Sequence, residues 1–155
     1  MKSNLATEVI SRLQGKTLVT AESLTGGGIG HCLTSVSGSS AVYKGGIISY
    51  TNAVKHKILG VPEDVLEQLG AVSEPVAKAM AEGAKRLLEA DIAVSVTGLA
   101  GPGGDEYGNP VGTVFIGYSD VYRSCVKHCL FSGSREEVRE QTVCEALKLV
   151  LEYNR

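Results

Sequence analysis

The sequence lacks a strong excess of charge of either sign. Its 155 residues include 15 lysines and arginines and 17 aspartates and glutamates, which gives a formal net charge of −2. Basic and acidic residues are interspersed, so the chain has no basic stripe that could neutralise a phosphate backbone. The composition therefore argues against a protein dedicated to nucleic-acid binding.

Long apolar runs are also missing. No stretch approaches the roughly 18 apolar residues that a bilayer-spanning helix needs, and residues 1–5 contain no apolar core of the kind found in signal peptides. We therefore expect a cytoplasmic protein with no membrane partner. The length fits a single domain over residues 1–155, which can bury about 68–70% of the surface of the unfolded chain without a disulfide or metal.

The four cysteines and three histidines lack the spacings of metal sites. No C-x-x-C pair occurs, and no H-x-x-x-H pair occurs. The sequence therefore predicts neither a zinc ribbon nor a thioredoxin-like motif, and no metal. We interpret all four cysteines as buried thiols, with Cys125 and Cys129 on the same face of a strand.

Glycine, by contrast, is abundant. The 19 glycines make up about 12% of the chain, against a typical ~7%. They cluster at 26–30, 45–46 and 98–108, between segments with regular apolar spacing. Glycines placed in this way indicate backbone that approaches a ligand closely or adopts a positive φ.

Strands and helices alternate along most of the chain. Apolar spacing predicts strands at 16–21, 45–50 and 92–97, and helices at 4–14, 25–36, 52–59, 62–70 and 73–90. Strands at 112–118 and 124–131 should form an antiparallel hairpin. A last helix should begin after Ser134, where Ser134 and Glu137 form a capping box. This order predicts an α/β fold with a mixed, mostly parallel sheet, helices on both faces, and ligands at the carboxyl ends of the strands.

Ser23 follows the first predicted strand, in the segment Ala21-Glu22-Ser23-Leu24-Thr25-Gly26-Gly27-Gly28. This places the serine at the N-terminus of a helix, where free N–H groups could stabilise an oxyanion or hold a phosphate. The spacing matches neither the phosphate-loop motif nor the dinucleotide-binding motif. From this pattern alone, Ser23 is equally well explained as a helix cap followed by glycines that allow close packing.

Two further segments could contribute to the same site. Tyr50 ends a strand and Lys55 lies on the next helix; a lysine beside a serine can act as a general base when burial lowers its pKa, although solvated lysines are commoner. Thr97 and Gly98 follow the strand 92–97, where backbone N–H groups could converge on an anion or form an ordinary turn. The polar stretch 105–109 that follows is expected to be a mobile surface excursion.

Arg135 stands at the first position of the last predicted helix. A cation there opposes the helix dipole at a cost of about 0.3–1 kcal/mol, and Arg139 adds a second positive charge one turn later. A guanidinium that binds a phosphate or carboxylate would explain this arrangement. Glu136 and Glu137 also partly compensate the charge without any ligand.

Taken together, these segments resemble the CinA C-terminal domain family, the stand-alone nicotinamide-nucleotide amidohydrolases. The matching segments lie in the family's order and spacing and cover essentially the whole chain: TAESLTGGGIG, GSSAVYKGGIISYTNAVKHKILGV, GAVSEPVAKAMAEGA, SVTGLAGPGG, PVGTVFIG and SREEVREQ. The resemblance implies a three-layer α/β/α fold and a homodimer or larger homo-oligomer. It also implies that a small-molecule nucleotide, nicotinamide mononucleotide, is hydrolysed to nicotinic acid mononucleotide and ammonia without a cofactor or metal.

The resemblance assigns roles to particular residues. Ser23 would be the nucleophile, Lys55 the base that deprotonates it, and Tyr50 an assisting group at the same centre. Thr97, Gly98 and Arg135 would bind the substrate at its phosphate end. The complete set of expected substrate-binding residues is Gly26, Gly27, Thr97, Gly98 and Arg135, the first two allowing the helix after the serine to approach the amide oxygen.

The chain departs from the family pattern in two places. Asn109 stands where the family often has a lysine, and the sequence Ser132-Gly133-Ser134-Arg135 replaces Pro-Gly-Asp-Arg before the last helix. Larger family members carry an N-terminal pyrophosphatase-type domain that these residues lack, so no pyrophosphatase activity is expected. The alternative to the enzyme is a non-catalytic nucleotide-binding or regulatory module, in which Ser23 merely caps a helix.

Overall fold

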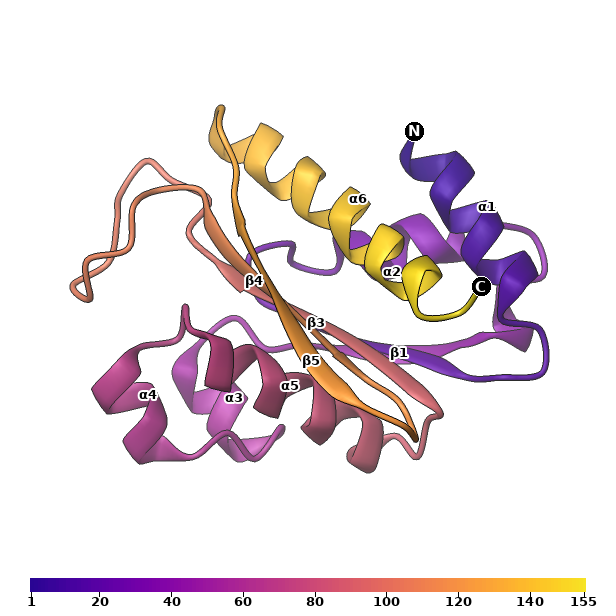
Figure 1. The fold of residues 1–155 in the computed structure, drawn as a ribbon, viewed down its shortest axis with the longest axis horizontal. Helices are drawn as coiled ribbons and strands as arrows, with labels where there is room; N and C mark the ends of the chain where they lie inside the picture. Colours follow the sequence, from indigo (N-terminus) through magenta and orange to yellow (C-terminus); the bar gives the residue numbers. More distant parts are fainter.

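A computed structural model describes residues 1–155 and contains one five-stranded sheet between two layers of helices (Figure 1). The strands lie in the order β2-β1-β3-β4-β5. Their bounds are Leu18–Glu22 for β1, Tyr43–Ile48 for β2, Ile92–Gly98 for β3, Thr113–Ser119 for β4 and Ser124–Leu130 for β5. Strand β1 pairs in parallel with β2 and β3, whereas β4 is antiparallel to both β3 and β5. Four of the five strands therefore run in one direction, as a mixed, mostly parallel sheet requires.

The helices divide between the two faces of the sheet (Figure 1). One face is covered by α1 (Lys2–Arg12), α2 (Gly28–Thr34) and α6 (Arg135–Glu152). The other is covered by α3 (Asn52–Lys57), α4 (Glu63–Leu69) and α5 (Glu74–Leu87), and a short 3₁₀ turn over Ser39–Ala41 precedes β2. The predicted α/β class and the three-layer α/β/α arrangement are confirmed.

Alternation along β1 and β3 determines which layer each side chain reaches, because successive side chains of a strand point to opposite faces. Leu18 and Val96 belong to the core under α1, α2 and α6. Val19, Ala21 and Ala93 belong to the core under α3, α4 and α5. Glu22 continues the first series towards α2, and Ser23, the next residue, follows the second series towards α3.

Local sequence signals located several elements correctly. The capping box is present, since the Ser134 side chain accepts from the Glu137 N–H and the Glu137 carboxylate accepts from the Ser134 N–H. The β4–β5 hairpin forms as predicted. Helix α3 is capped by Thr51, whose hydroxyl accepts from the Val54 N–H.

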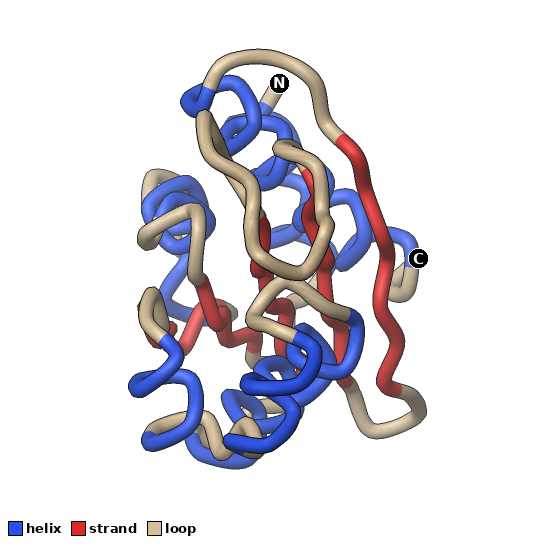
Figure 2. Tube along the Cα trace, turned by 90° about the vertical axis from the view of Figure 1, so that its left-hand side faces the viewer, coloured by secondary structure: helices blue, strands red, loops and turns tan.

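The expectation that all four cysteines are buried was wrong. Only Cys32 is buried; the other three cysteines are half-buried. The stretch 105–109 lies at the surface, as expected, and it also contacts the body of the protein: the Tyr107 hydroxyl donates to the Glu67 carbonyl at 2.7 Å and the Asn109 amide to the Val72 carbonyl at 3.2 Å. The loop between β3 and β4, which contains this stretch, lies at the edge of the molecule that faces the viewer in Figure 2.

Candidate active site

A cavity of about 400 Å³ opens at the carboxyl ends of β1 and β3. It brings together six of the eight site residues expected from the sequence. The residues that line it are Ser23, Leu24, Tyr50, Asn52, Lys55, Ala71, Val72, Thr97, Gly98, Leu99, Ala100, Gly101, Gly103 and Arg135. Ligand sites in open α/β sheets lie at this edge, and the volume falls within the range of small-molecule sites.

Ser23 and Lys55 form the centre of the cavity. The Lys55 Nζ atom lies 3.0 Å from the Ser23 Oγ atom and also contacts the carbonyl oxygens of Ser49 at 2.8 Å and Tyr50 at 3.1 Å. Lys55 is 1% exposed, and no carboxylate lies within ion-pair distance of its ammonium. The short helix α3 begins at Asn52, two residues after Tyr50, and turns Lys55 back over the end of β2.

Burial changes the acidity of this lysine. Removal from water disfavours the charged ammonium and, without a neighbouring carboxylate, lowers the pKa of Lys55 from 10.5 to about 8. The same three partners satisfy both protonation states. The ammonium has three N–H groups for three oxygens, whereas the neutral amine donates to the two carbonyls and directs its lone pair at the Ser23 hydroxyl.

Tyr50 and Arg135 form the outer wall. The Tyr50 side chain is 58% exposed, and its hydroxyl accepts from the Arg135 Nη2 atom at 3.2 Å. The Arg135 Nη1 atom donates to the Gly101 carbonyl at 2.7 Å. No carboxylate pairs with Arg135, so its charge remains uncompensated within the chain.

Thr97 lies beside Ser23 on the neighbouring strand. Glu22 pairs with Val96 in the parallel register, so Ser23 and Thr97 are the next pair and share a face. The Thr97 hydroxyl donates its single hydrogen to the Ala71 carbonyl at 2.8 Å. Only its acceptor lone pairs remain for a ligand, so Thr97 suits an N–H donor rather than a phosphate oxygen.

Close packing or a positive φ explains the glycines of the expected site without a ligand. A Cβ atom on Gly98 would lie 2.7 Å from the Thr113 carbonyl oxygen of the neighbouring strand β4, where Gly98 pairs with Val114. Gly26 and Gly27 have φ values of +58° and +103°, and Gly27 is the N-cap of α2. Gly98 lines the cavity, whereas Gly26 and Gly27 do not.

The N-terminus of α2 is occupied, contrary to the expectation of free N–H groups. The Glu22 carboxylate, 2% exposed, accepts from the N–H groups of Ile29 and Gly30 at 2.8 and 3.0 Å and from the Thr25 hydroxyl at 2.6 Å. A carboxylate at this position is stabilised by the helix dipole and by these donors. Helix α2 consequently begins at Gly28 rather than at Thr25.

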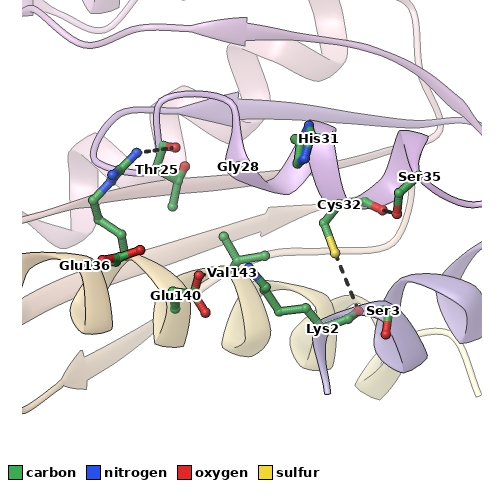
Figure 3. A pocket seen from close by; sticks show the side chains of 11 residues that line it. Lys2, Ser3, Thr25, Gly28, His31, Cys32, Ser35, Glu136, Glu140 and Val143 are labelled. Atoms are coloured by element: carbon green, nitrogen blue, oxygen red, sulfur yellow. Dashed lines mark hydrogen bonds and ion pairs between the residues drawn. The ribbon is translucent and has the colours of Figure 1, made fainter.

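A second pocket of about 320 Å³ lies on the other side of the Ser23 turn, between α1, α2 and α6 (Figure 3). Figure 3 shows Thr25 and Gly28 facing Glu136, Glu140 and Val143 across it. Arg139 also lines this pocket; its Nε atom donates to the Leu24 carbonyl at 2.9 Å and its Nη2 atom to the Thr25 carbonyl at 3.3 Å.

Sequence reasoning missed the roles of Glu22 and Arg139. Glu22 was part of the serine motif, but its partners lie seven and eight residues later and depend on the turn between them. Arg139 was grouped with Arg135 as a second cation on the same side of the helix, yet the two arginines reach different pockets. No spacing in the sequence distinguishes the two arginines, because their different pockets arise from tertiary contacts: Arg135 reaches Gly101, and Arg139 reaches Leu24.

The structure contains no group of three or more histidine, cysteine, aspartate or glutamate side chains placed to hold a metal ion. None of the helices combines the length and the apolar character needed to cross a membrane.

The chain is similar to known proteins over nearly all its length. A CinA-like protein from Parasynechococcus marenigrum is 53% identical over 148 residues, 93% of this chain and 35% of that protein. A CinA-like protein from Thermotoga neapolitana is 45% identical over 144 residues, 91% of this chain and 35% of that protein. The chain thus spans about a third of the length of these curated relatives.

Solved structures agree with this similarity. The crystal structure of a competence-damaged protein (CinA) superfamily protein from Escherichia coli matches with a TM-score of 0.96 and 35% identity, covering 99% of this chain and 90% of that one. A competence or damage-inducible protein from Enterobacter asburiae matches with a TM-score of 0.97 and 31% identity, covering 100% and 99%. The family model of the CinA C-terminal domain matches residues 2–154. The chain therefore belongs to the CinA C-terminal domain family.

Proposed function

We propose that this protein is an amidohydrolase that deamidates nicotinamide mononucleotide, with Ser23 as nucleophile and Lys55 as base. The observation that carries the proposal is the buried Lys55 amine 3.0 Å from the Ser23 hydroxyl, with no carboxylate beside it. A lysine with a pKa of about 8 is partly neutral near physiological pH, so it can accept the serine proton.

The reaction follows from this pair. Neutral Lys55 takes the Ser23 proton while the Oγ atom attacks the amide carbon and the carbonyl oxygen becomes an oxyanion. As the tetrahedral intermediate collapses, the Lys55 ammonium gives its proton to the leaving nitrogen, and ammonia departs from the acyl-enzyme ester. A water then attacks the ester and gives a proton to Lys55, which returns a proton to Ser23 as the acid is released.

The remaining cavity residues suit the two ends of this substrate. Arg135 offers uncompensated positive charge and further N–H donors for the phosphate. The Tyr50 hydroxyl lies beside Arg135, while the Tyr50 carbonyl holds Lys55. Thr97 is more consistent with the amide end than with the phosphate end, because its free lone pairs can accept from the carboxamide N–H₂.

Ammonia release tests the proposal. Wild-type protein incubated with nicotinamide mononucleotide should release ammonia, and Ser23→Ala should abolish the release because no other group can form the acyl-enzyme. Ser37→Ala is the matched control, since Ser37 is an exposed serine outside the cavity. Absence of release by the wild type above that by Ser23→Ala would reject the amidohydrolase.

A non-catalytic nucleotide-binding module is the second candidate. It is favoured by the three oxygen partners of Lys55, which would also hold a permanently charged ammonium. Calorimetry with nicotinamide mononucleotide at pH 9, combined with the ammonia assay, separates the two. Binding without turnover, unchanged by Ser23→Ala, would support the module.

A further inference from the structure

The backbone N–H of Leu24, the residue after the proposed nucleophile, has no hydrogen-bond acceptor within the protein. The N–H of Ser23 donates to the Val96 carbonyl at 3.0 Å and that of Gly26 to the Ser23 carbonyl at 3.1 Å, whereas those of Thr25 and Gly27 also lack an acceptor. Leu24 is 4% exposed and lines the cavity that contains Ser23. A buried amide without a partner is costly in a folded protein, so this N–H is available for a ligand.

The other unpaired N–H groups of this turn belong to residues outside the Ser23 cavity: Thr25 lines the second pocket, and Gly27 lines neither. An oxyanion on the bound amide needs a donor close to the Ser23 Oγ atom. The N–H groups of Ile29 and Gly30 at the start of α2 are occupied by the Glu22 carboxylate, which lies on the opposite face of β1 from Ser23. The first turn of α2 therefore cannot supply the oxyanion contact.

Arg139 holds the two peptide groups that follow the Leu24 N–H, while the peptide group that carries this N–H is held at the Ser23 carbonyl by the Gly26 N–H. The Arg139 guanidinium, which lines the second pocket, bridges the carbonyl oxygens of Leu24 and Thr25. Glu22 holds the Thr25 hydroxyl. Two consecutive carbonyls held by one planar guanidinium leave the turn little freedom to rotate, so its N–H groups keep a fixed direction.

We infer that the Leu24 N–H stabilises the oxyanion and that Arg139 is the positioning residue that aims it. This inference rests on the amidohydrolase reaction proposed above. Arg139 lines the second pocket and not the Ser23 cavity, so it acts through the turn rather than on the substrate. Its loss should consequently weaken the transition state more than the ground state.

The test compares Arg139→Met and Arg139→Lys with the wild type. Removing one oxyanion donor costs about 10²–10³-fold in kcat in well-studied hydrolases. Because Arg139→Met misdirects the donor rather than deleting it, we expect kcat to fall by about 10–100-fold while KM changes by less than about 3-fold. Arg139→Lys keeps the charge but cannot bridge both carbonyls, so it should show a smaller loss of the same kind.

An aldehyde probe separates positioning from a merely structural role. The probe is the mononucleotide in which an aldehyde replaces the carboxamide; Ser23 adds to it to form a hemiacetal whose oxygen occupies the oxyanion position. Its inhibition constant should rise in parallel with the loss of kcat. The Arg12→Met variant, which loses only an exposed pair with Glu8 in α1, should match the wild type in both measurements.

The outcomes are distinct. Wild-type turnover combined with unchanged kcat and unchanged aldehyde inhibition in folded Arg139→Met would overturn the inference and leave the amidohydrolase standing. If Arg139→Met does not fold, Arg139→Lys decides by the same criteria. A wild type that releases no ammonia would overturn both proposals.

Discussion

At the scale of single residues, Lys55 has an unusual environment, because lysine side chains are ordinarily solvated. Its amine is surrounded by two backbone carbonyls and one hydroxyl, and no opposite charge compensates it. Such burial is costly for the folded state whenever the lysine is protonated. Titration of Lys55 should therefore affect both the proposed base and the free energy of unfolding.

This linkage gives a prediction about stability. The folded-state pKa of about 8 lies below the ordinary value of 10.5, so between these values the unfolded chain binds more protons than the folded one. The free energy of unfolding should therefore rise as the pH increases from about 8 to 10.5, through the contribution of Lys55. Urea unfolding of the wild type and Lys55→Met should show a steeper rise with pH in the wild type; parallel curves would contradict the assignment.

Thr97 gives a second prediction at this scale. Because its only hydrogen is committed to Ala71, it should favour the amide substrate over the acid product. In a Ser23→Ala background, Thr97→Val should weaken binding of nicotinamide mononucleotide about 5–10-fold, in keeping with the loss of one hydrogen bond, and leave binding of nicotinic acid mononucleotide unchanged or tighter. Calorimetry measures both, and Thr97→Ser should retain the preference. Equal weakening of both ligands would contradict this role.

How far the sequence predicted these residues depends on whether they were judged alone or together. Ser23 alone was equally consistent with a helix cap, and Lys55 alone was more often expected to be solvated. Their 3.0 Å contact depends on the parallel pairing of β1 with β2 and on the turn at Tyr50, which no local pattern specifies. The family resemblance supplied what local reasoning could not.

At the scale of elements, signals contained within a few residues were reliable. The Ser134 capping box and the β4–β5 hairpin require only neighbours in the chain, and both occur as predicted. Helix α2 was predicted three residues too early, because its start depends on Glu22 reaching back from β1. No pattern of neighbouring residues predicts a helix cap that comes from a strand outside the helix.

The Glu22 cap predicts a stability effect. Glu22→Ala would leave the N–H groups of Ile29 and Gly30 and the Thr25 hydroxyl without their acceptor. Each buried polar group left unpaired costs about 1–3 kcal/mol, so the loss in free energy of unfolding should exceed that for an exposed glutamate. Chemical denaturation of Glu22→Ala and of the exposed-site control Glu67→Ala measures the difference. Equal stabilities would contradict the cap.

At the scale of the whole molecule, the cavity is assembled from segments that are distant in the sequence. The turn after β1 supplies Ser23, α3 supplies Lys55, β3 and its loop form one wall, and the start of α6 supplies Arg135. The β3–β4 loop completes this wall, and Tyr107 and Asn109 join it by hydrogen bonds to the segment around α4. The general position of the cavity was predictable from strand order, whereas the anchoring of the loop was not.

The expected homo-oligomer is a prediction at this scale. Light scattering of the purified 16.2 kDa chain should give a mass of twice that value or a higher multiple. A monomer across the accessible concentration range would contradict the expectation. The Ser23–Lys55 contact lies within one chain, so the proposed chemistry does not depend on the result.

The pH dependence of ammonia release tests the central claim most directly. We expect kcat/KM for nicotinamide mononucleotide to increase with pH around a midpoint near 8 and to level off above it, because only neutral Lys55 can deprotonate Ser23. Lys55→Met should reduce release to the level of Ser23→Ala at every pH, while Lys57→Met, an exposed lysine on the same helix, should retain the wild-type profile. Undiminished release by Lys55→Met would contradict the Ser23–Lys55 mechanism.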